Sequence, residues 1–209
     1  MDAAVALLDE QGLDGLTMRA VADRLGAGAM SLYRHVANRD ELLDLVVARL
    51  LDGVVRRPRT GRWRADLEAI AGDMHAALVR RPQLTVLLTS RAGSGTGGLR
   101  DLDVTLGVLR GAGLSARNAA LANHALGNYV AGAALWEAAG LGGASGPERR
   151  ERADEAAHAL AALDPGVAPN VQWAAGELFE GTAGDRFAYG LALLLDGVEA
   201  RLPPDRRTG

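Results

Sequence analysis

Four side chains that can donate hydrogen bonds to phosphates and to the edges of nucleic acid bases lie close together near the N-terminus. They are Ser31, Tyr33, Arg34 and His35. A helix that only buried one face would not require these side chains within a turn and a half. Phosphate contacts position a protein on double-stranded DNA, and base contacts let it read the sequence. The cluster therefore predicts a DNA-reading helix over about residues 29–36.

The residues before this cluster predict a first short helix and a tight turn. Thr17 can cap a helix that begins at Met18, because its hydroxyl can accept a hydrogen bond from a free backbone N–H. The apolar face of that helix consists of Val21, Ala22 and Leu25. Gly26 and Gly28 bracket the turn that follows, where a positive φ is easily adopted only by glycine. Two short helices joined in this way form a helix-turn-helix, the layout of many DNA readers.

Apolar residues around the cluster predict its orientation. Leu32 and Val36 are four residues apart, so both should turn inward and direct the polar residues between them outward. Asn38 and Glu41 predict a capping box at the start of the next helix. The apolar pairs of that amphipathic helix are Leu42/Leu43, Val46/Val47, Leu50/Leu51 and Val54/Val55.

These N-terminal residues resemble the TetR (tetracycline-repressor) family of transcriptional regulators. The matching blocks are GLDGLTMRAVADRLG at Gly12–Gly26 and SLYRHVANRDELLD at Ser31–Asp44. Later segments are similar to the C-terminal regulatory domain of the tetracycline-repressor branch, at Gly61–Leu67 and Phe187–Leu202. The resemblance implies a dimeric regulator that binds operator DNA through its N-terminal domain and a small molecule through its C-terminal domain.

The resemblance also implies which positions touch DNA. Thr17 and Arg19 match positions that contact the DNA backbone or bases, and Arg39 matches a basic phosphate contact. The positions at which family members vary their base-reading residues correspond to Ala29, Met30 and Ser31.

Three further positions in the predicted reading helix are Tyr33, Arg34 and His35, of which two match the family pattern and one departs from it. Tyr33 and His35 match positions that contact the DNA backbone, although Tyr33 could instead pack on the neighbouring helix. Arg34 occupies a position that is often aromatic in the tetracycline repressor, so it either contacts DNA or is a solvated charge.

The start of the chain departs from the family pattern. Family members usually carry several residues, often basic, before the first helix, whereas this sequence begins at Met1-Asp2 and enters that helix at once. Either the natural start lies further upstream, or the protein lacks an arm that helps to grip the DNA backbone. In the second case its affinity for DNA should be weaker.

Helical patterns continue to the C-terminus, and no strand pattern is present, so we expect an all-α fold. Pro58 interrupts the pattern and predicts a boundary between a helix-turn-helix domain (residues 1–57) and a helical regulatory domain (residues 58–209). The Gly93–Gly98 loop lacks the Gly-Lys-Ser/Thr ending of a nucleotide-binding loop. Helices are expected over about residues 63–81, 82–91, 99–110, 115–139, 148–163, 170–179 and 185–202.

Composition excludes several classes of protein. The 209 residues contain no cysteine, which excludes disulfides, thiol catalysis and cysteine-based zinc sites. No signal peptide and no apolar run long enough to span a bilayer is present, so we expect a cytoplasmic protein. The net charge is −3, but residues 19–39 carry four arginines and one acid, a local charge of +3 with histidine neutral. Such a patch can bind phosphates while the rest of the chain stays acidic.

Two predicted helices carry faces suited to a subunit interface. The apolar stripe of residues 185–202 consists of Phe187, Leu191, Leu194, Leu195, Val198 and Leu202. In residues 115–139, Gly127, Ala131 and Ala134 share one side and would allow another helix to approach closely. Both helices from each subunit could form an intermolecular four-helix bundle, as the resemblance also implies; alternatively, these faces are buried inside one subunit. A two-fold dimer would read both halves of a palindrome.

Polar side chains on apolar helix faces predict where a small molecule could bind. The candidate ligand-binding residues are Met74, His75, His124, Asn128, Trp136 and Trp173. Together they would suit an aromatic, moderately polar molecule, although His124 and Asn128 could instead satisfy each other or a backbone group inside a core. The drug-and-magnesium ligand set of the tetracycline repressor has no convincing match, and the histidines lack metal-ligand pairing. No metal and no cofactor are therefore predicted.

The leading hypothesis is a ligand-responsive homodimeric regulator, most simply a repressor, that binds a palindromic operator and is released by a small molecule. The alternative is a helical small-molecule-binding or protein-binding dimer whose DNA-binding head is weakened. An enzyme is disfavoured, because paired carboxylates are lacking and Ser, His and Asp candidates have no strand or elbow context.

Overall fold

The computed structural model describes residues 1–56, 58–90, 99–140, 147–164 and 166–206, apart from the side chains of residues 29, 53, 55–56, 89–90, 147–150 and 152–153. The described residues form helices joined by short connections, without a β-strand. This agrees with the predicted all-α fold. Among these helices none is long and apolar enough to cross a membrane. The predicted Gly93–Gly98 loop lies outside the described residues.

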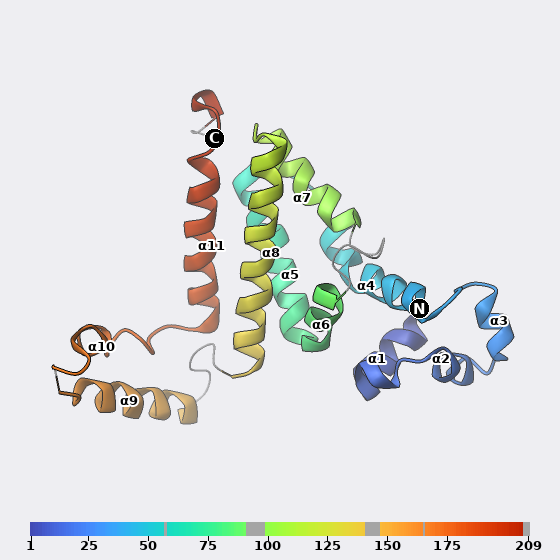
Figure 1. Cartoon of the computed structure of the whole chain (residues 1–209), viewed down its shortest axis with the longest axis horizontal. Coiled ribbons are helices and arrows are strands. Elements are labelled where there is room, and N and C mark those ends of the chain that lie inside the picture. The colour runs from blue at the N-terminus through green and yellow to red at the C-terminus, as the bar shows by residue number, and fades with distance from the viewer. Residues whose placement is uncertain (57, 91–98, 141–146, 165, 207–209) are drawn as a thin grey trace.

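The N-terminal helices project from one end of the molecule (Figure 1). They are α1 (Asp2–Gly15), α2 (Met18–Arg24), α3 (Ala29–Tyr33) and α4 (Arg39–Arg56). As predicted, Thr17 caps α2, its hydroxyl oxygen accepting a hydrogen bond of 3.1 Å from the backbone N–H of Ala20. Gly26 has a φ of +61°, the left-handed conformation expected in the turn between α2 and α3.

Three local predictions for this region were wrong. Leu25, predicted to lie on the apolar face of the first short helix, is 56% exposed. Gly28 has a φ of −65° and an extended ψ, because it occupies the N-cap of α3 rather than a left-handed turn position. The second short helix ends at Tyr33 instead of continuing to Val36. Val36 is nevertheless 5% exposed, so it anchors the chain after α3 as the spacing with Leu32 predicted.

Helix α4 links the N-terminal helices to the rest of the molecule. Its start is capped by Asn38, whose Oδ1 accepts a 2.9 Å hydrogen bond from the N–H of Glu41. The carboxylate of Glu41 reaches back to the N–H of Ala37, one residue before the predicted capping-box partner. The apolar stripe of α4 is buried as predicted at Leu42, Leu43, Val46, Val47, Leu51 and Val54. It belongs to one continuous hydrophobic core that runs from Ala4 to Leu202.

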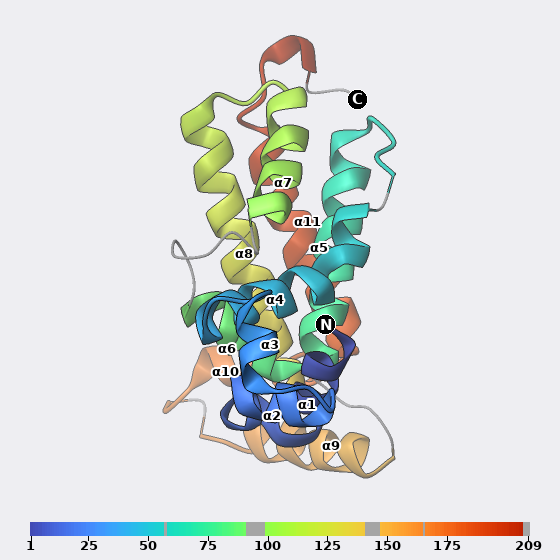
Figure 2. The same ribbon diagram turned by 90° about the vertical axis from the view of Figure 1, so that its right-hand side faces the viewer.

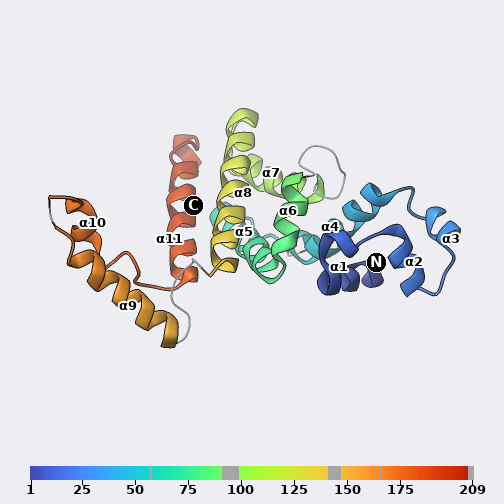
Figure 3. The same cartoon turned by 60° about the horizontal axis from the view of Figure 1, so that its bottom comes forward.

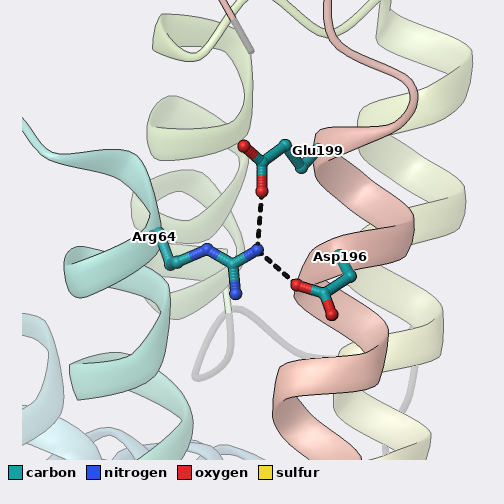
Figure 4. Close-up of polar contacts among 3 residues, drawn as sticks. All are labelled: Arg64, Asp196 and Glu199. Atoms are coloured by element: carbon teal, nitrogen blue, oxygen red, sulfur yellow. Dashed lines mark hydrogen bonds and ion pairs between the residues drawn. The ribbon is translucent and has the colours of Figure 1, made fainter. Parts of the chain in front are cut away.

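The body of the molecule is a layered helical bundle (Figure 2). Its helices are α5 (Trp63–Arg80), α6 (Pro82–Ser90), α7 (Leu99–Gly111), α8 (Ala116–Ala138) and α11 (Ala183–Glu199). Helix α5 packs against α4, α6, α7 and α8, and α11 packs on α8. At one end, Arg64 of α5 contacts Asp196 and Glu199 of α11 at 2.6 and 2.8 Å (Figure 4).

Helices α9 (Pro147–Ala161) and α10 (Pro169–Ala174) lie on the opposite side of the molecule from α1–α3 (Figures 1 and 3). The side-chain amide of Gln172 joins them by donating to the carbonyl oxygens of Ala161 and Leu163 at 2.9 and 3.1 Å. The helix predicted over about residues 170–179 is shorter than expected, since residues 175–179 form turns. A short 3₁₀ helix, η1 (Pro204–Arg206), follows α11.

The apolar stripe of α11 lies within the protomer. Leu191, Leu195, Val198 and Leu202 are each at most 5% exposed, and Phe187 and Leu194 pack against the same core. On α8, Ala134 is buried and Ala131 packs against the core. The buried residues of these faces are thus covered by other helices of the same chain, as the alternative of burial inside one subunit expected. Partner contacts for the half-buried Phe187, Leu194 and Ala131 and for the exposed Gly127 stay a prediction.

Candidate nucleic-acid interface and ligand cavity

Helix α3 lies at the far end of the molecule, beyond α2 and α4 (Figure 1). Met30 and Tyr33 are 79% and 47% exposed, although large apolar and aromatic side chains are usually buried. Arg34 and His35 are also exposed, and Ser31 is half-buried and accepts a 3.3 Å hydrogen bond from Arg34. The predicted cluster therefore faces solvent. The side chain of Ala29, another predicted contact, lies outside the described part of the chain.

Helix α2 packs against α3. Met18, Val21 and Ala22 are buried, and Leu32 of α3 packs against the same core. Arg24 at the end of α2 forms an ion pair with Glu10 of α1. This ion pair ties α2 to α1, whereas the turn at Gly26 and the shared apolar core join α3 to α2. A DNA reader needs such a supported second helix for base contacts.

The remaining predicted DNA contacts have different surroundings. Arg19 has a side chain that is 89% exposed and lies 3.7 Å from Asp23 on the same helix. Thr17 is exposed at the N-terminus of α2. The guanidinium of Arg39 donates to the backbone carbonyls of Leu16 and Leu13 at 3.1 and 2.8 Å. Arg39 therefore ties the start of α4 to the connection between α1 and α2, in addition to the phosphate contact that the resemblance implies.

A cavity of about 210 Å³ lies between α5, α7 and α8 in the body. Its walls are largely apolar and include Leu67, Ile70, Ala71, Met74, Leu126 and Val130. Its polar groups are Asp101 and Thr105 of α7 and Asn123 of α8. Small-molecule sites commonly combine an apolar lining with a few polar groups that fix orientation, but their volumes are commonly about 300–1,000 Å³. This half-open cavity would hold a small ligand, or part of a larger one.

Asp101 is the electrostatically distinctive group of this cavity. Its Oδ1 is buried and has no hydrogen-bond partner among the described residues. Burial raises the pKa of Asp101 to about 7, because the charged carboxylate is poorly solvated there. The hydroxyl of Thr105, one turn later, donates to the backbone carbonyl of Asp101 at 3.0 Å. Its proton is therefore not donated to the carboxylate.

Of the six residues predicted to bind a ligand, only Met74 borders this cavity. His75 turns away and stacks on Phe187 of α11, with ring centroids 4.0 Å apart. Its Nε2 lies 3.4 Å from a carboxylate oxygen of Glu137. Burial lowers the pKa of His75, and the nearby charge of Glu137 opposes this effect.

The other four predicted residues are exposed. His124 and Asn128 do share a face of α8, but that face is open to solvent and not to the cavity. Trp136 is 62% exposed and Trp173 of α10 is 88% exposed. Since successive residues of a helix are rotated by about 100°, the face one residue earlier turns inward and presents Asn123 and Gly127. The role of these four residues in ligand binding stays a prediction.

The sequence reasoning missed Asp101, Thr105 and Asn123. Asp101 and Thr105 are four residues apart and so lie on one face of α7, beside the apolar residues Leu102 and Val104. An acid and a hydroxyl at this spacing within an apolar segment were the available signal. The partner face of α8 could not be chosen from its sequence, since this helix is rich in alanine and glycine on several sides.

A second, larger hollow of about 700 Å³ lies near the start of α5 and the end of α7. Arginines and acids both line it, among them Arg59, Asp66 and Asp103. The carboxylate of Asp66 is occupied by Thr60, which donates from its N–H and hydroxyl at 2.8 and 2.9 Å, and by the N–H of Gly61 at 3.1 Å. This network shapes the connector between α4 and α5. Neither here nor elsewhere in the described residues is a group of three His, Asp or Glu side chains arranged to hold a metal ion.

The exposed helix-turn-helix and the helical body correspond to two known domain families. Residues 1–46 match the bacterial regulatory proteins of the tetR family, and residues 57–202 match the tetracyclin repressor-like C-terminal domain. The HTH-type transcriptional repressor DrrR1 of Streptomyces coeruleorubidus is 35% identical over 215 residues, covering 95% of this chain and 75% of the relative.

Solved structures agree with these matches. The TetR family protein ActR of Streptomyces coelicolor, in complex with (S)-DNPA, is 32% identical, with a TM-score of 0.75 and coverage of 95% of this chain and 94% of that one. Another TetR regulator from Streptomyces coelicolor is 27% identical, with a TM-score of 0.82 and coverage of 97% and 96%. The chain therefore belongs to the tetR family of bacterial regulatory proteins, with a helix-turn-helix DNA-binding domain followed by a tetracycline repressor-like helical domain.

Proposed function

We propose that this protein is a homodimeric transcriptional repressor whose binding to a palindromic operator is relieved by a small molecule. The observation that carries the proposal is the exposed surface formed by α3 and the two residues after it, with Met30, Tyr33, Arg34 and His35, together with a separate cavity in the body. An exposed helix-turn-helix and a separate cavity are the two sites that a DNA-binding protein regulated by a small molecule requires. We place its action in the cytoplasm, where operator DNA is, and assign it no enzymatic activity.

On the DNA side, α3 would enter the major groove. Ser31, Arg34 and Met30 would face base edges, while Tyr33 and His35 would contact the DNA backbone. Arg19, Thr17 and Arg39 would bind phosphates on either side, with Ala29 at the start of the reading helix. The local charge of +3 over residues 19–39 favours this association although the whole chain is acidic.

The dimer would form through the exposed faces of α8 and α11. A groove of about 320 Å³ runs between these helices and is lined by Leu121, Ala125 and Leu193, among others. Leu121 and Leu193 are 55% and 56% exposed, and Tyr189 of α11 is 70% exposed. A second copy would cover these apolar side chains and complete an intermolecular four-helix bundle. Leu194 and Val198 of the predicted stripe line the same groove.

The effector would bind in the cavity between α5, α7 and α8. ActR, which shares this fold, has been solved in complex with (S)-DNPA and with actinorhodin. Helix α4 packs against α5, α6 and α7 as well as α1, so it can carry a change in the cavity to the DNA-binding helices. We place the domain boundary at Pro58, directly after this helix. A coupling of about 1–3 kcal/mol would weaken DNA binding about 5–150-fold.

The test is DNA binding by the purified protein to the intergenic region beside its own gene, at about 50 mM and 200 mM salt. Fluorescence anisotropy would compare the wild type with Tyr33→Ala and Arg34→Ala. Arg100→Ala is the matched control, since Arg100 is an exposed arginine of the regulatory domain. We expect specific binding that is weaker in both α3 variants, unchanged in the control and reduced at the higher salt.

Other outcomes would contradict specific parts of the proposal. Binding that is equal in the wild type and both α3 variants would exclude α3 as the reading helix. The absence of specific binding, in this chain and in one extended by translated upstream codons, would favour a ligand-binding or protein-binding dimer with a weakened head. A monomer at micromolar concentration in sedimentation would exclude the dimer.

A further inference from the structure

The cavity between α5, α7 and α8 contains one acid in otherwise neutral surroundings. Asp101 borders it from the first turn of α7, and the opposite walls are the side chains of Leu67, Ile70 and Leu126. Asp101 is the one ionisable group among the described residues that line this cavity. Arg100 and Asp103, its neighbours on α7, are exposed.

One oxygen of the half-buried Asp101 carboxylate lacks the partner that a buried carboxylate oxygen normally has. Buried carboxylates are usually paired with a cation or satisfied by hydrogen bonds, because the ionised form is costly to remove from water. Here Oδ1 is buried without any hydrogen-bond donor from the described residues. The pKa of Asp101 is raised to about 7 because the buried, unpaired carboxylate is poorly stabilised in its charged form. A ligand that placed a positive charge beside this oxygen would supply the missing partner.

We propose that the effector is a mainly apolar small molecule that carries a protonated amine, and that the amine forms an ion pair with Asp101 inside this cavity. The inference rests on the proposed function, since it assigns the chemical class of the effector. The cavity volume of about 210 Å³ suits an apolar part of one or two rings.

Two further polar groups fit the same ligand. An ammonium has three donors, and a carboxylate alone satisfies only part of them. The amide oxygen of Asn123 on α8 and the hydroxyl oxygen of Thr105 on α7 border the same cavity and can accept hydrogen bonds. The amine would thus bridge α7 and α8, two helices that pack against α5 and, through it, against α4.

The experiment uses two matched pairs of probes: benzylamine with benzyl alcohol, and 1-naphthylmethylamine with 1-naphthylmethanol. Within each pair the shape is the same and only the cation differs. Isothermal titration calorimetry would measure their affinity for the full chain without DNA, for the wild type, Asp101→Asn and Asp103→Asn. Asp103→Asn is the matched control, because it removes an exposed carboxylate two residues away on the same helix.

We expect the wild type at about pH 8 to bind at least one amine about tenfold or more tightly than its alcohol. Asp101→Asn should abolish this preference and leave the affinity for the alcohol unchanged, while Asp103→Asn retains it. Between about pH 6 and pH 8 the amine affinity of the wild type should rise about tenfold, because the carboxyl with a pKa of about 7 must ionise to pair. The alcohol should show no such rise.

Three results would overturn the inference. They are equal affinity for amine and alcohol, retention of the amine preference in Asp101→Asn, and failure of both amines to bind at millimolar concentration. Tighter binding of the alcohols at low pH would instead assign Asp101 as a protonated hydrogen-bond donor. Since these titrations contain no DNA, their failure leaves the operator-binding test intact, and failure of operator binding leaves the amine preference measurable.

Discussion

The hydroxyl of Tyr129 in α8 donates a 2.8 Å hydrogen bond to the backbone carbonyl of Phe187 in α11. The two rings lie nearly parallel, with centroids 5.6 Å apart and an interplanar angle of 14°. One turn further along α11, Gly190 lies directly under the tyrosine ring. Tyr129 therefore sets the distance between the two helices to which we assign the dimer interface.

Gly190→Ala should destabilise the protein. A Cβ at this position would approach the Tyr129 ring atoms Cζ and Cε2 at 2.6 and 2.8 Å, closer than packed atoms tolerate. The loss should be about 1–3 kcal/mol, the usual effect of overpacking, measured by urea unfolding. Gly197→Ala on the same helix is the control, since the nearest atom to its Cβ would be Arg201 Nη1 at 3.7 Å. Equal stability of the two variants would contradict the close approach.

Arg64 and Glu199 should show a modest, salt-dependent coupling. They are 2.8 Å apart, and their side chains are 28% and 36% exposed (Figure 4). The hydrogen bond to Glu199 raises the pKa of Arg64, so its charge is retained at every practical pH. A double-mutant cycle of Arg64→Met and Glu199→Gln should give about 0.2–1 kcal/mol of coupling, less at high salt. The exposed Arg62, replaced by methionine in a parallel cycle, should give none.

Asp66→Asn should weaken the connector between α4 and α5. Burial alone would raise the pKa of Asp66, but the hydrogen bonds from Thr60 and Gly61 outweigh this effect and lower it. An amide cannot accept all of these bonds, so the free energy of unfolding near neutral pH should fall by about 1–3 kcal/mol.

The same carboxylate predicts a pH dependence. Since the pKa of Asp66 is lower in the folded state than in the unfolded state, its contribution is present above the unfolded value and is lost as the pH falls through the folded value. Urea unfolding of wild type and Asp66→Asn should therefore converge at strongly acidic pH. A difference that did not change with pH would contradict the ionised form assigned here.

The contribution of Asp101 to stability should depend on pH in the opposite direction to that of Asp66. Its folded pKa of about 7 lies above the model-peptide value of 3.8, so the folded protein favours the protonated form. The stability it contributes is greatest at low pH and is lost as the pH rises through about 7. The melting temperature of Asp101→Asn minus that of the wild type should therefore increase from about pH 5 to pH 8. Asp103→Asn, which replaces an exposed carboxylate on the same helix, is the matched control.

Arg39→Ala should lower the stability of the N-terminal helices by about 1 kcal/mol, because two backbone carbonyls lose a charged donor. Arg34→Ala, which removes an exposed arginine of the same region, should leave the melting temperature unchanged. In operator binding, a smaller slope of log affinity against log salt for Arg39→Ala would show that it also neutralises a phosphate. An unchanged melting temperature would exclude the structural role.

Much of the local structure could be predicted. The cap at Thr17, the left-handed turn at Gly26 and the buried stripe of α4 are determined by interactions within a few residues. Of the predicted ligand residues, only Met74 borders the cavity. A polar pair such as His124 and Asn128 has the same spacing on a helix face that meets solvent as on one that meets a cavity. Their spacing establishes that they lie together and not which way they point.

Sequence patterns were enough to predict most of the helices, the Thr17 cap and the family, together with the exposed donors in and directly after the reading helix. Periodicity and capping act locally, so they survive without knowledge of the partner helices. Only the tertiary structure decided that the stripe of α11 is buried within the protomer, that α8 turns Asn123 inward, and that Asp101 stands alone in a cavity. Each of these depends on α5, α7, α8 and α11 meeting across long separations in the chain, where the burial of one side chain is decided by another helix.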